Sequence, residues 1–306
     1  MRRILVLRGG ALGDFLVTLP ALALLRRRWP GAVIELAGNP VAAELARSRG
    51  LLQAVHSSAQ ARWAALYAAA PLGDDFGRWL AEFDLVLSYW PDPDGTLAHH
   101  FPRRPDQRFV AHPSQPSRGP AAAHYADALR PWGLEPPAPL CRLEPGAVVD
   151  HPVPIDPRER RRQLTRPGPG RIVLHPGSGS ARKNWPVERW AEVAGWLRTT
   201  RHVEVVACAG EAEADRPLAG LGEVRTGLSL PQLEDLLRSA CLFLGHDSGV
   251  SHLAAACGVP SLLLFGPTDP TLWAPPTDEV RILHRPGPMT GLTVAEVKAA
   301  ISDALS

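Results

Sequence analysis

The feature that most constrains this chain is the alternation of short apolar segments with segments of helical periodicity. Short apolar runs in the first half predict β-strands at 3–8, 32–38, 83–90 and 108–112. Apolar residues at helical spacing predict helices at 15–30, 39–50 and 122–133. Continuous apolar strands separated by helices are typical of a parallel sheet buried on both faces. The first half is therefore predicted to be a doubly wound α/β domain.

A second series of the same kind follows a break. Residues 135–170 are rich in proline and arginine and have almost no periodic apolar pattern, which is typical of a linker. Beyond the break, strands are predicted at 171–177, 202–210, 241–247 and 261–266, with helices at 186–199, 230–240, 249–258 and 293–305. We therefore expect two Rossmann-like domains, 1–150 and 170–306, joined by a linker at 151–169 and facing a central cleft. Ligands of such sheets bind beyond the carboxyl ends of the strands.

The composition restricts the classes of partner and the location that are expected for this chain. The 306 residues carry a formal net charge of +2, so bulk charge gives no case for a nucleic acid. Four widely spaced cysteines without a CxxC pair fit a reducing cytosol and argue against a zinc site; they are Cys141, Cys208, Cys241 and Cys257. No signal peptide is recognisable, and no apolar window approaches the ~18 residues of a membrane-spanning helix. The expected location is cytoplasmic, with at most peripheral contact at the inner face of the membrane.

The segment LRGGALGDFLVTLP (7–20) joins the first strand to the first helix through a glycine-rich turn. Such turns usually surround a phosphate, yet Asp14 stands where the phosphate charge would lie. Two roles are open for Asp14: a cap for a helix beginning at Phe15, or a carboxylate presented for chemistry. The G-x-G-x-x-G spacing of a dinucleotide-binding loop is absent, which argues against a nicotinamide oxidoreductase.

The segment GHDSGVSHLAAACGVPSLLLFGPTDP (245–270) carries the second group of polar residues. Asp247, Ser248 and Gly249 lie between a strand and a helix, and His252 is one turn further along. Asp247 or Ser248 can be an ordinary helix cap, but the free N–H groups at a helix N-terminus also suit a phosphate. The serine is one position away from the G-x-S-x-G pattern of serine hydrolases. Cap and phosphate site are both open for this turn.

The segment HPGSGSARKNWP (175–186) provides a third group. Ser178, Gly179 and Ser180 offer hydroxyl and amide groups, and Lys183 can reach a diphosphate, although the spacing is not that of a Walker A loop. Glu211 follows the strand at 202–210 directly, where an acid often binds ribose hydroxyls. A plain surface acid is the alternative for Glu211.

Two further patterns resemble metal sites only superficially. Asp92 and Asp94 form a D-x-D pair, but the flanking prolines predict a turn. His99 and His100 are adjacent, so their side chains diverge, and no carboxylate stands at ligand spacing. We expect no metal at either place.

Three ordered motifs, GALGDFLVTLPAL, HPGSGSARKNWP and HDSGVSHLAAACGVPSLLLFGPTDP, resemble those of glycosyltransferase family 9, the ADP-heptose:lipopolysaccharide heptosyltransferases. The resemblance covers nearly the whole chain apart from the middle of the first domain. It implies a GT-B fold in which the N-terminal domain binds the acceptor and the C-terminal domain binds the sugar nucleotide. It leaves open whether the last helix packs back on the N-terminal domain. It also implies an inverting transfer without a metal or other cofactor.

The same resemblance assigns roles to individual residues. It implies that Asp14 is the catalytic base and that Lys183 binds the donor phosphates. The donor-side positions it implies are Ser178, Gly179, Lys183, Glu211, Leu228, Asp247, Ser248, Gly249 and His252. The acceptor-side positions are Gly13, Val17 and Thr18, and Val17 stands where inner-core heptosyltransferases of the family carry histidine.

The function expected from this resemblance is transfer of a heptose, or a similar sugar, from an ADP-sugar to a hydroxyl of a glycolipid or oligosaccharide such as lipopolysaccharide core. Two alternatives stay open. The acceptor can instead be a natural product or a protein, or the chain can be a non-catalytic sugar-nucleotide-binding protein. The acceptor, the stereochemistry of the sugar and the oligomeric state are open at the level of sequence.

Overall fold

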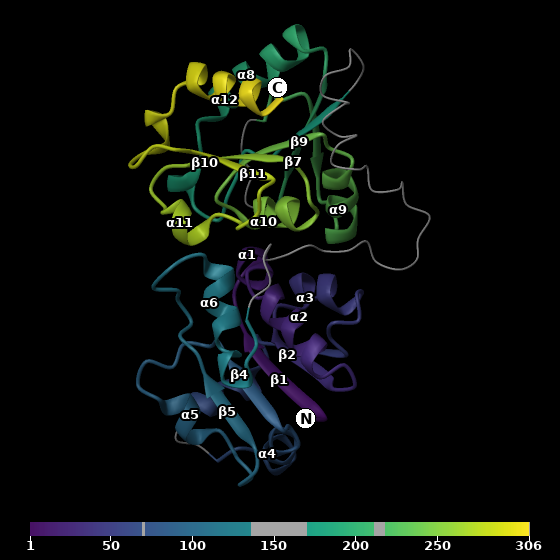
Figure 1. The fold of residues 1–306 in the computed structure, drawn as a ribbon, viewed down its shortest axis with the longest axis vertical. Coiled ribbons are helices and arrows are strands. Elements are labelled where there is room, and N and C mark those ends of the chain that lie inside the picture. The colour runs from purple at the N-terminus through teal and green to yellow at the C-terminus, as the bar shows by residue number, and fades with distance from the viewer. Residues whose placement is uncertain (69–70, 136–169, 211–217, 306) are drawn as a thin grey trace. The chain divides into compact units, whose positions relative to one another are not determined.

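The computed structural model describes residues 1–68, 71–135, 170–210 and 218–305. The chain divides into two compact units, Met1–Ala138 and Pro139–Ser306, each built on one sheet (Figure 1). The predicted domain boundaries at 150 and 169 lie outside the described residues. The two predicted α/β halves are both present.

The N-terminal unit contains a five-stranded parallel sheet in the order β3-β2-β1-β4-β5. Its strands are β1 Arg3–Arg8, β2 Val33–Gly38, β3 Ala54–Ser57, β4 Leu85–Ser88 and β5 Arg108–Ala111. The central strand β1 is fully buried from Ile4 to Leu7, as its continuous apolar sequence predicts. It pairs with β2 on one side and β4 on the other.

Helices connect these strands. They are α1 Leu12–Leu16, α2 Leu19–Arg28, α3 Pro40–Arg47, α4 Asp74–Ala81, α5 Thr96–His100 and α6 Ala121–Asp127, with 3₁₀ segments η1 Ala61–Tyr67 and η2 Arg130–Trp132. Helices α2 and α6 pack against each other. A separate apolar cluster includes Trp63, Phe83 and Trp90. The predicted single helix at 15–30 is wrong: α1 begins earlier, and the chain breaks at Val17–Thr18 because Pro20 starts a new helix.

The C-terminal unit contains a six-stranded parallel sheet in the order β11-β10-β9-β6-β7-β8. Its strands are β6 Arg171–Leu174, β7 Glu204–Ala209, β8 Glu223–Thr226, β9 Leu242–His246, β10 Ser261–Phe265 and β11 Val280–His284. Its helices are α8 Val187–Thr200, α9 Leu230–Arg238, α10 Gly249–Ala256, α11 Pro270–Trp273 and α12 Val294–Leu305, with η3 Ala181–Lys183 and η5 Met289–Gly291. Figure 1 shows α8 and α12 on one side of this sheet and α9 and α10 on the other. In the described part of the chain, no helix is long and apolar enough to cross a membrane.

Both sheets reverse their strand order at one point. In the N-terminal unit the reversal lies between β1 and β4, and in the C-terminal unit between β6 and β9. The loops that leave two such strands diverge to opposite faces and open a crevice at the carboxyl edge of the sheet, where ligands of doubly wound sheets bind. The loops after β1, β6 and β9 are the three that carry the sequence motifs.

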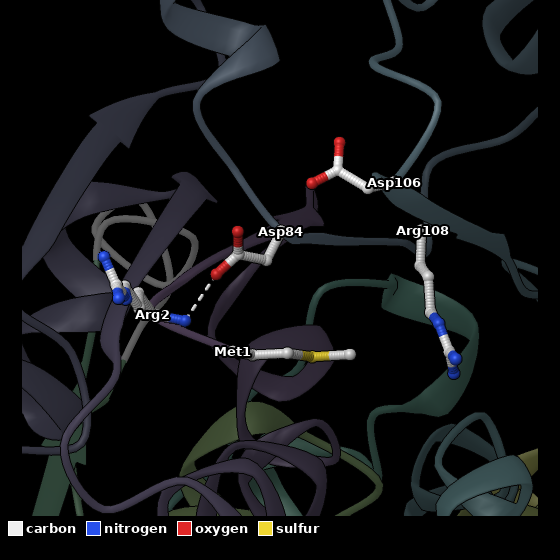
Figure 2. A pocket seen from close by; sticks show the side chains of 5 residues that line it. All are labelled: Met1, Arg2, Asp84, Asp106 and Arg108. Atoms are coloured by element: carbon white, nitrogen blue, oxygen red, sulfur yellow. Dashed lines mark hydrogen bonds between the residues drawn. The ribbon is translucent and has the colours of Figure 1, made fainter.

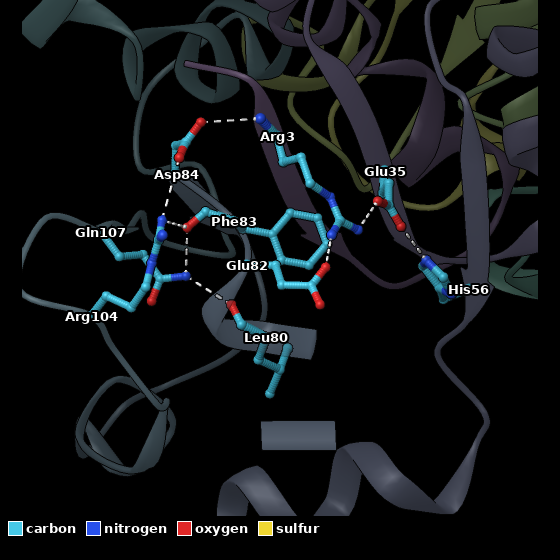
Figure 3. A network of polar contacts seen from close by, with 9 residues as sticks. All are labelled: Arg3, Glu35, His56, Leu80, Glu82, Phe83, Asp84, Arg104 and Gln107. Atoms are coloured by element: carbon cyan, nitrogen blue, oxygen red, sulfur yellow. Dashed lines mark hydrogen bonds and ion pairs between the residues drawn. The ribbon is translucent and has the colours of Figure 1, made fainter. Parts of the chain in front are cut away.

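A polar network crosses the opposite, amino-terminal half of the first sheet (Figure 3). The buried Glu35 on β2 accepts from Arg3 Nη2 at 2.6 Å and from His56 Nε2 at 2.8 Å. Burial alone would raise the pKa of Glu35, but hydrogen bonds from His56 and Arg3 outweigh burial, and the pKa lies below its ordinary value. Gln107 closes the far end of the network by donating to the Leu80 and Phe83 carbonyls, each at 2.8 Å. This network ties β1, β2 and β3 together away from the predicted site.

Candidate active site

The turn after β9 begins α10 with a serine cap. Ser248 has extended backbone angles, and its hydroxyl accepts from Ser251 N at 3.3 Å. The cap predicted for this turn is therefore Ser248, and its side chain is buried. The helix geometry leaves the N–H groups of Gly249 and Val250 without an intrahelical acceptor. Backbone amides, rather than the serine hydroxyl, are the groups that this turn can offer to an anion.

The loop after β6 is held together by its own side chains. The Ser178 hydroxyl lies 2.8 Å from the Ser180 carbonyl and 2.7 Å from Asn184 Oδ1, and it accepts from Ser180 N at 3.3 Å. Because Ser178 is buried and engaged in this way, it fixes the shape of the loop. Gly179 is exposed, and a Cβ added there would meet no atom within 4 Å.

Lys183 and Asp247 join these two loops. The Lys183 ammonium, in η3, lies 3.2 Å from Asp247 Oδ2. The two residues are 64 positions apart in sequence and meet at the strand-order reversal of the C-terminal sheet. The pair places one cation beside the N-terminus of α10, whose dipole also favours negative charge. This is the arrangement of groups that would bind a phosphate.

A buried histidine that sequence reasoning left without a role fixes this arrangement. His246, the last residue of β9, is fully buried, and its Nε2 accepts from Trp185 N at 2.9 Å and from Trp190 Nε1 at 3.3 Å. Its Nδ1 lies 3.4 Å from the Gly177 carbonyl. One ring thus links β9 to both ends of the loop that carries Lys183. No local pattern in the sequence identifies this role, because His246 ends an apolar strand and its partners come from other elements.

The remaining donor-side positions are Glu211, Leu228 and His252. Glu211 lies outside the described residues. Leu228 lies two residues beyond the end of β8 and is partly buried, which places it at the carboxyl edge of the same sheet. His252 lies in the first turn of α10, where its N–H bonds the Ser248 carbonyl at 3.2 Å.

In the N-terminal unit, Asp14 is the third residue of α1 and not the cap of a helix beginning at Phe15. Its Oδ2 accepts from Ala11 N at 2.9 Å, so the carboxylate does satisfy one free N–H at the helix start. Its Oδ1 lies 3.2 Å from Arg8 Nη2. The side chain is still 41% exposed, so these contacts do not bury the carboxylate. The predicted cap of a helix beginning at Phe15 is therefore wrong, because α1 begins at Leu12, and the carboxylate stays available for the chemical role.

Arg8, which ends β1, is a residue that the sequence analysis did not single out. It is buried, and its Nε lies 3.0 Å from the Asp14 carbonyl and 3.1 Å from Thr18 Oγ1. Its guanidinium carbon lies 4.3 Å from the centre of the Tyr125 ring, on α6. Burial raises the pKa of Tyr125, against the opposing effect of Arg8, so the ring beneath the cation is a neutral phenol.

The glycine-rich turn has a steric function at Gly10. This residue has φ +99°, and a Cβ there would lie 2.5 Å from Asp14 Oδ2. An L side chain would therefore be strained and would also collide with the carboxylate. At this position of the turn that resembles a phosphate loop, glycine is required because it makes room for Asp14.

The three acceptor-side positions lie close to Asp14 in the chain but do not all face solvent. Gly13 is inside α1, and its carbonyl accepts from Val17 N at 3.1 Å. Val17 and Thr18 are buried, and the Thr18 hydroxyl donates to the Asp14 carbonyl at 2.9 Å. Thr18 thus supports Asp14 and Arg8 from within the fold.

The Asp92–Asp94 pattern, which resembled a metal site, is explained by local structure. Asp92 accepts from the N–H groups of Leu97 and Ala98, both at 2.9 Å, and Asp94 accepts from Thr96 N at 3.1 Å. These bonds begin α5, so the predicted turn is confirmed. Within residues 1–68, 71–135, 170–210 and 218–305, no cluster of three or more metal-ligating side chains is present.

A cavity of about 390 Å³ lies at the amino-terminal edge of the first sheet, away from these residues (Figure 2). It is lined by Met1, Arg2, Asp84, Asp106 and Arg108. Asp84 accepts from the backbone N–H groups of Arg2 and Arg3, so its charge is already engaged. No predicted site residue lines this cavity.

Comparison with known proteins agrees with this architecture. A model of glycosyltransferase family 9 (heptosyltransferase) matches residues 145–290. The chain is 31% identical to lipopolysaccharide heptosyltransferase 1 of Pseudomonas aeruginosa over 291 residues, which cover 88% of this chain and 79% of that protein. Its fold is similar to a family 9 glycosyl transferase from Veillonella parvula DSM 2008, with a TM-score of 0.72, 19% identity and coverage of 99% and 97% of the two chains.

It is also similar to the Escherichia coli heptosyltransferase WaaC with ADP, with a TM-score of 0.69, 21% identity and coverage of 99% of each chain. At these identities the two solved structures establish the fold, two Rossmann-like units of GT-B type. The sequence match to the Pseudomonas protein extends through both units. The chain is thus a glycosyltransferase that belongs to family 9, the heptosyltransferase family.

Proposed function

We propose that this protein transfers a heptose from ADP-heptose to a hydroxyl group of a lipopolysaccharide core acceptor, with inversion at the anomeric carbon and without a metal. The observation that carries the proposal is the Lys183–Asp247 pair, at 3.2 Å, beside the N-terminus of α10. Support for the donor comes from the WaaC structure, which contains ADP. Support for the acceptor comes from the name of the 31% identical Pseudomonas protein.

In the proposed reaction, one bond forms, one bond breaks and one proton is transferred. The acceptor hydroxyl gives its proton to the Asp14 carboxylate while its oxygen forms a bond to the anomeric carbon. The bond between that carbon and the β-phosphate oxygen breaks, and ADP leaves with one additional negative charge. Lys183 and the N–H groups at the start of α10 stabilise that charge. A divalent cation would otherwise stabilise the negative charge on the leaving ADP. Because these fixed positive groups can do so, we propose that the reaction needs no metal.

The proposal divides the roles between the two units. The N-terminal unit, 1–150, binds the acceptor and provides Asp14; the C-terminal unit, 170–306, binds the donor through Lys183, Gly249 and His252, with Glu211 on the ribose and Leu228 near the adenine. Ser178 and Gly179 contribute through the shape and backbone of their loop. The proposed reaction takes place in the cytoplasm, with at most peripheral contact at the inner face of the membrane.

The test is a transfer assay with product masses. Purified protein is incubated with ADP-heptose and with heptose-deficient lipopolysaccharide core, in the presence and absence of EDTA. We expect one heptosyl unit to be added, with the β-phosphate displaced as ADP and the rate unchanged by EDTA. ADP binding without transfer to this acceptor, or to a panel of other glycans and peptides, would instead support the non-catalytic alternative. A rate abolished by EDTA and restored by a divalent cation would overturn metal independence.

A further inference from the structure

The contacts of Arg8 converge on a single residue. Three of its polar contacts involve Asp14 or the hydroxyl that supports it: Nη2 to Asp14 Oδ1 at 3.2 Å, Nε to the Asp14 carbonyl at 3.0 Å, and Nε to Thr18 Oγ1 at 3.1 Å. Arg8 therefore holds both the side chain and the backbone of Asp14. A surface ion pair would hold the carboxylate alone.

The cation is itself held in place. Arg8 is 6% exposed and stacks on Tyr125, 4.3 Å from the ring centre. The Tyr125 hydroxyl donates to the Ser114 carbonyl at 2.8 Å, and the Tyr89 hydroxyl donates to the Tyr125 carbonyl at 2.6 Å. The guanidinium is thus fixed from strand β1, from helix α6 and from the loop after β5. A buried cation without these partners would carry a large desolvation cost.

An arginine is required for this geometry. Nε and Nη2 point to different acceptors, a carbonyl and a carboxylate, and the planar guanidinium fixes the angle between them. A lysine at this position would keep the charge but would offer one point donor on a flexible stem. The choice of arginine at the end of an apolar strand is therefore explained by orientation as well as by charge.

We propose that Arg8 is a positioning residue for the transfer reaction: it fixes the orientation of the Asp14 carboxylate toward the acceptor hydroxyl. This inference rests on the proposed role of Asp14 as the base. Ala11 N holds Oδ2 and Arg8 holds Oδ1, so one donor on each oxygen fixes the carboxylate plane and leaves the exposed lone pairs for the proton. A misplacement of about 1 Å at a reacting group can cost on the order of 10²-fold in rate.

The test compares kcat and donor KM for Arg8→Gln and Arg8→Lys. We expect Arg8→Gln to lower kcat by about 10²-fold with the donor KM unchanged. Arg8→Lys should recover part of that loss, because it restores the charge without the fork. The matched control is Arg3→Gln, which removes ion pairs to Glu35 and Glu82 at the start of the same strand. This control should lower the melting temperature and leave kcat unchanged.

A double-mutant cycle separates positioning from a general structural effect. In the Asp14→Asn background, Arg8→Gln should change kcat by less than about 2-fold, because residues that act as a unit are non-additive. An equal loss in both backgrounds, or wild-type kcat in Arg8→Gln, would overturn the inference. A wild-type kcat in the single variant Asp14→Asn would instead contradict the assignment of Asp14 as the base.

A second variant keeps the test decisive if Arg8→Gln does not fold. Thr18→Val keeps the shape of the side chain and removes the hydroxyl that bridges Arg8 Nε and the Asp14 carbonyl. It should lower kcat several-fold with the donor KM unchanged. Wild-type kcat in both Thr18→Val and Arg8→Lys would contradict the positioning role.

Discussion

The two units use the same scaffold to present opposite charges. In the N-terminal unit, Arg8 is 6% exposed and its partner Asp14 is 41% exposed. In the C-terminal unit the order is reversed, since Lys183 is 24% exposed and its partner Asp247 is 11% exposed. Each ion pair follows the central strand of its sheet, β1 or β6, at the point where the strand order reverses. The more exposed member is an anion in one unit and a cation in the other.

This difference explains how one fold can serve two tasks. A base must be an exposed anion held in a fixed orientation, and a buried arginine provides that orientation without competing for the substrate. A phosphate-binding group must be an accessible cation, and a less exposed aspartate can hold the lysine in place until the ligand arrives. In each ion pair, the member that is more buried leaves the opposite charge accessible to a ligand. Burial, rather than the type of loop, thus determines whether an anion or a cation is accessible.

The largest expected effect is at the exposed anion. Asp14→Asn should lower kcat by about 10²–10⁴-fold, because an amide cannot accept the acceptor proton, while ADP binding stays within 2-fold of the wild type. Steady-state kinetics and calorimetry with ADP measure the two quantities. Asp127→Asn is the matched control, since Asp127 is also paired with an arginine, Arg130, in the same unit. Loss of ADP affinity in Asp14→Asn would contradict the division of roles between the units.

The next largest effect is expected at Lys183, the more exposed member of its ion pair. Lys183→Met should weaken ADP binding by about 10–100-fold, because a charge-assisted hydrogen bond contributes about 1.5–3 kcal/mol. The sequence contains only one other lysine, Lys298, which pairs with Glu192 on α8 at 2.8 Å. Lys298→Met is therefore a control of the same chemistry, and its ADP affinity should match the wild type. Equal losses in the two variants would contradict a specific phosphate contact.

The glycines of the two loops provide a third comparison. Gly10→Ala introduces a Cβ at φ +99°, 2.5 Å from Asp14 Oδ2, and should cost about 1–2 kcal/mol of stability as well as lowering kcat about 10-fold. Gly179→Ala meets no atom within 4 Å and should leave the melting temperature unchanged. Thermal unfolding and kinetics of both variants test whether glycine is required by the carboxylate in one loop and dispensable for folding in the other.

The smallest effect on rate is expected outside both loops. Glu35→Gln should leave kcat unchanged and lower the free energy of unfolding by about 1–2 kcal/mol at pH 7, since it weakens bonds to Arg3 and His56. The pKa of Glu35 is lowered in the folded state, so its contribution is present above the ordinary value of 4.5 and is lost as the pH falls through the folded value. Urea unfolding of both proteins between pH 7 and pH 3 should therefore show the difference shrinking at acid pH. A difference that stays constant would exclude Glu35 as its source.

The central strands were predictable and most of the edge strands were not. The predicted segments at 3–8, 32–38 and 241–247 correspond to β1, β2 and β9, which are buried on both faces and read as continuous apolar runs. Three of the four edge strands escaped prediction: β3, β8 and β11. They are paired on one side and partly exposed, so polar residues interrupt their apolar pattern, as in EVRT of β8.

Among the site residues, those next to a local sequence pattern were predictable, and those defined by contacts with distant elements were not. Asp14, Lys183, Asp247 and Ser248 could be singled out because each stands next to a glycine-containing turn between a strand and a helix. Arg8 and His246 could not, because each lies at the end of an apolar strand and its partners come from other elements. The Lys183–Asp247 contact spans 64 positions, and no local pattern reports such a pair.

The sequence by itself determined the two α/β halves, the order of their main elements and the loops that carry the chemistry, because hydrophobic periodicity and turn residues are local properties of the chain. Only the tertiary structure decided which charge of each pair is exposed. That outcome depends on parallel pairing and on packing by distant residues, such as Tyr125 over Arg8 and Trp185 against His246. Burial is a property of the assembled sheet and its helices, so it becomes defined only when the whole unit has folded.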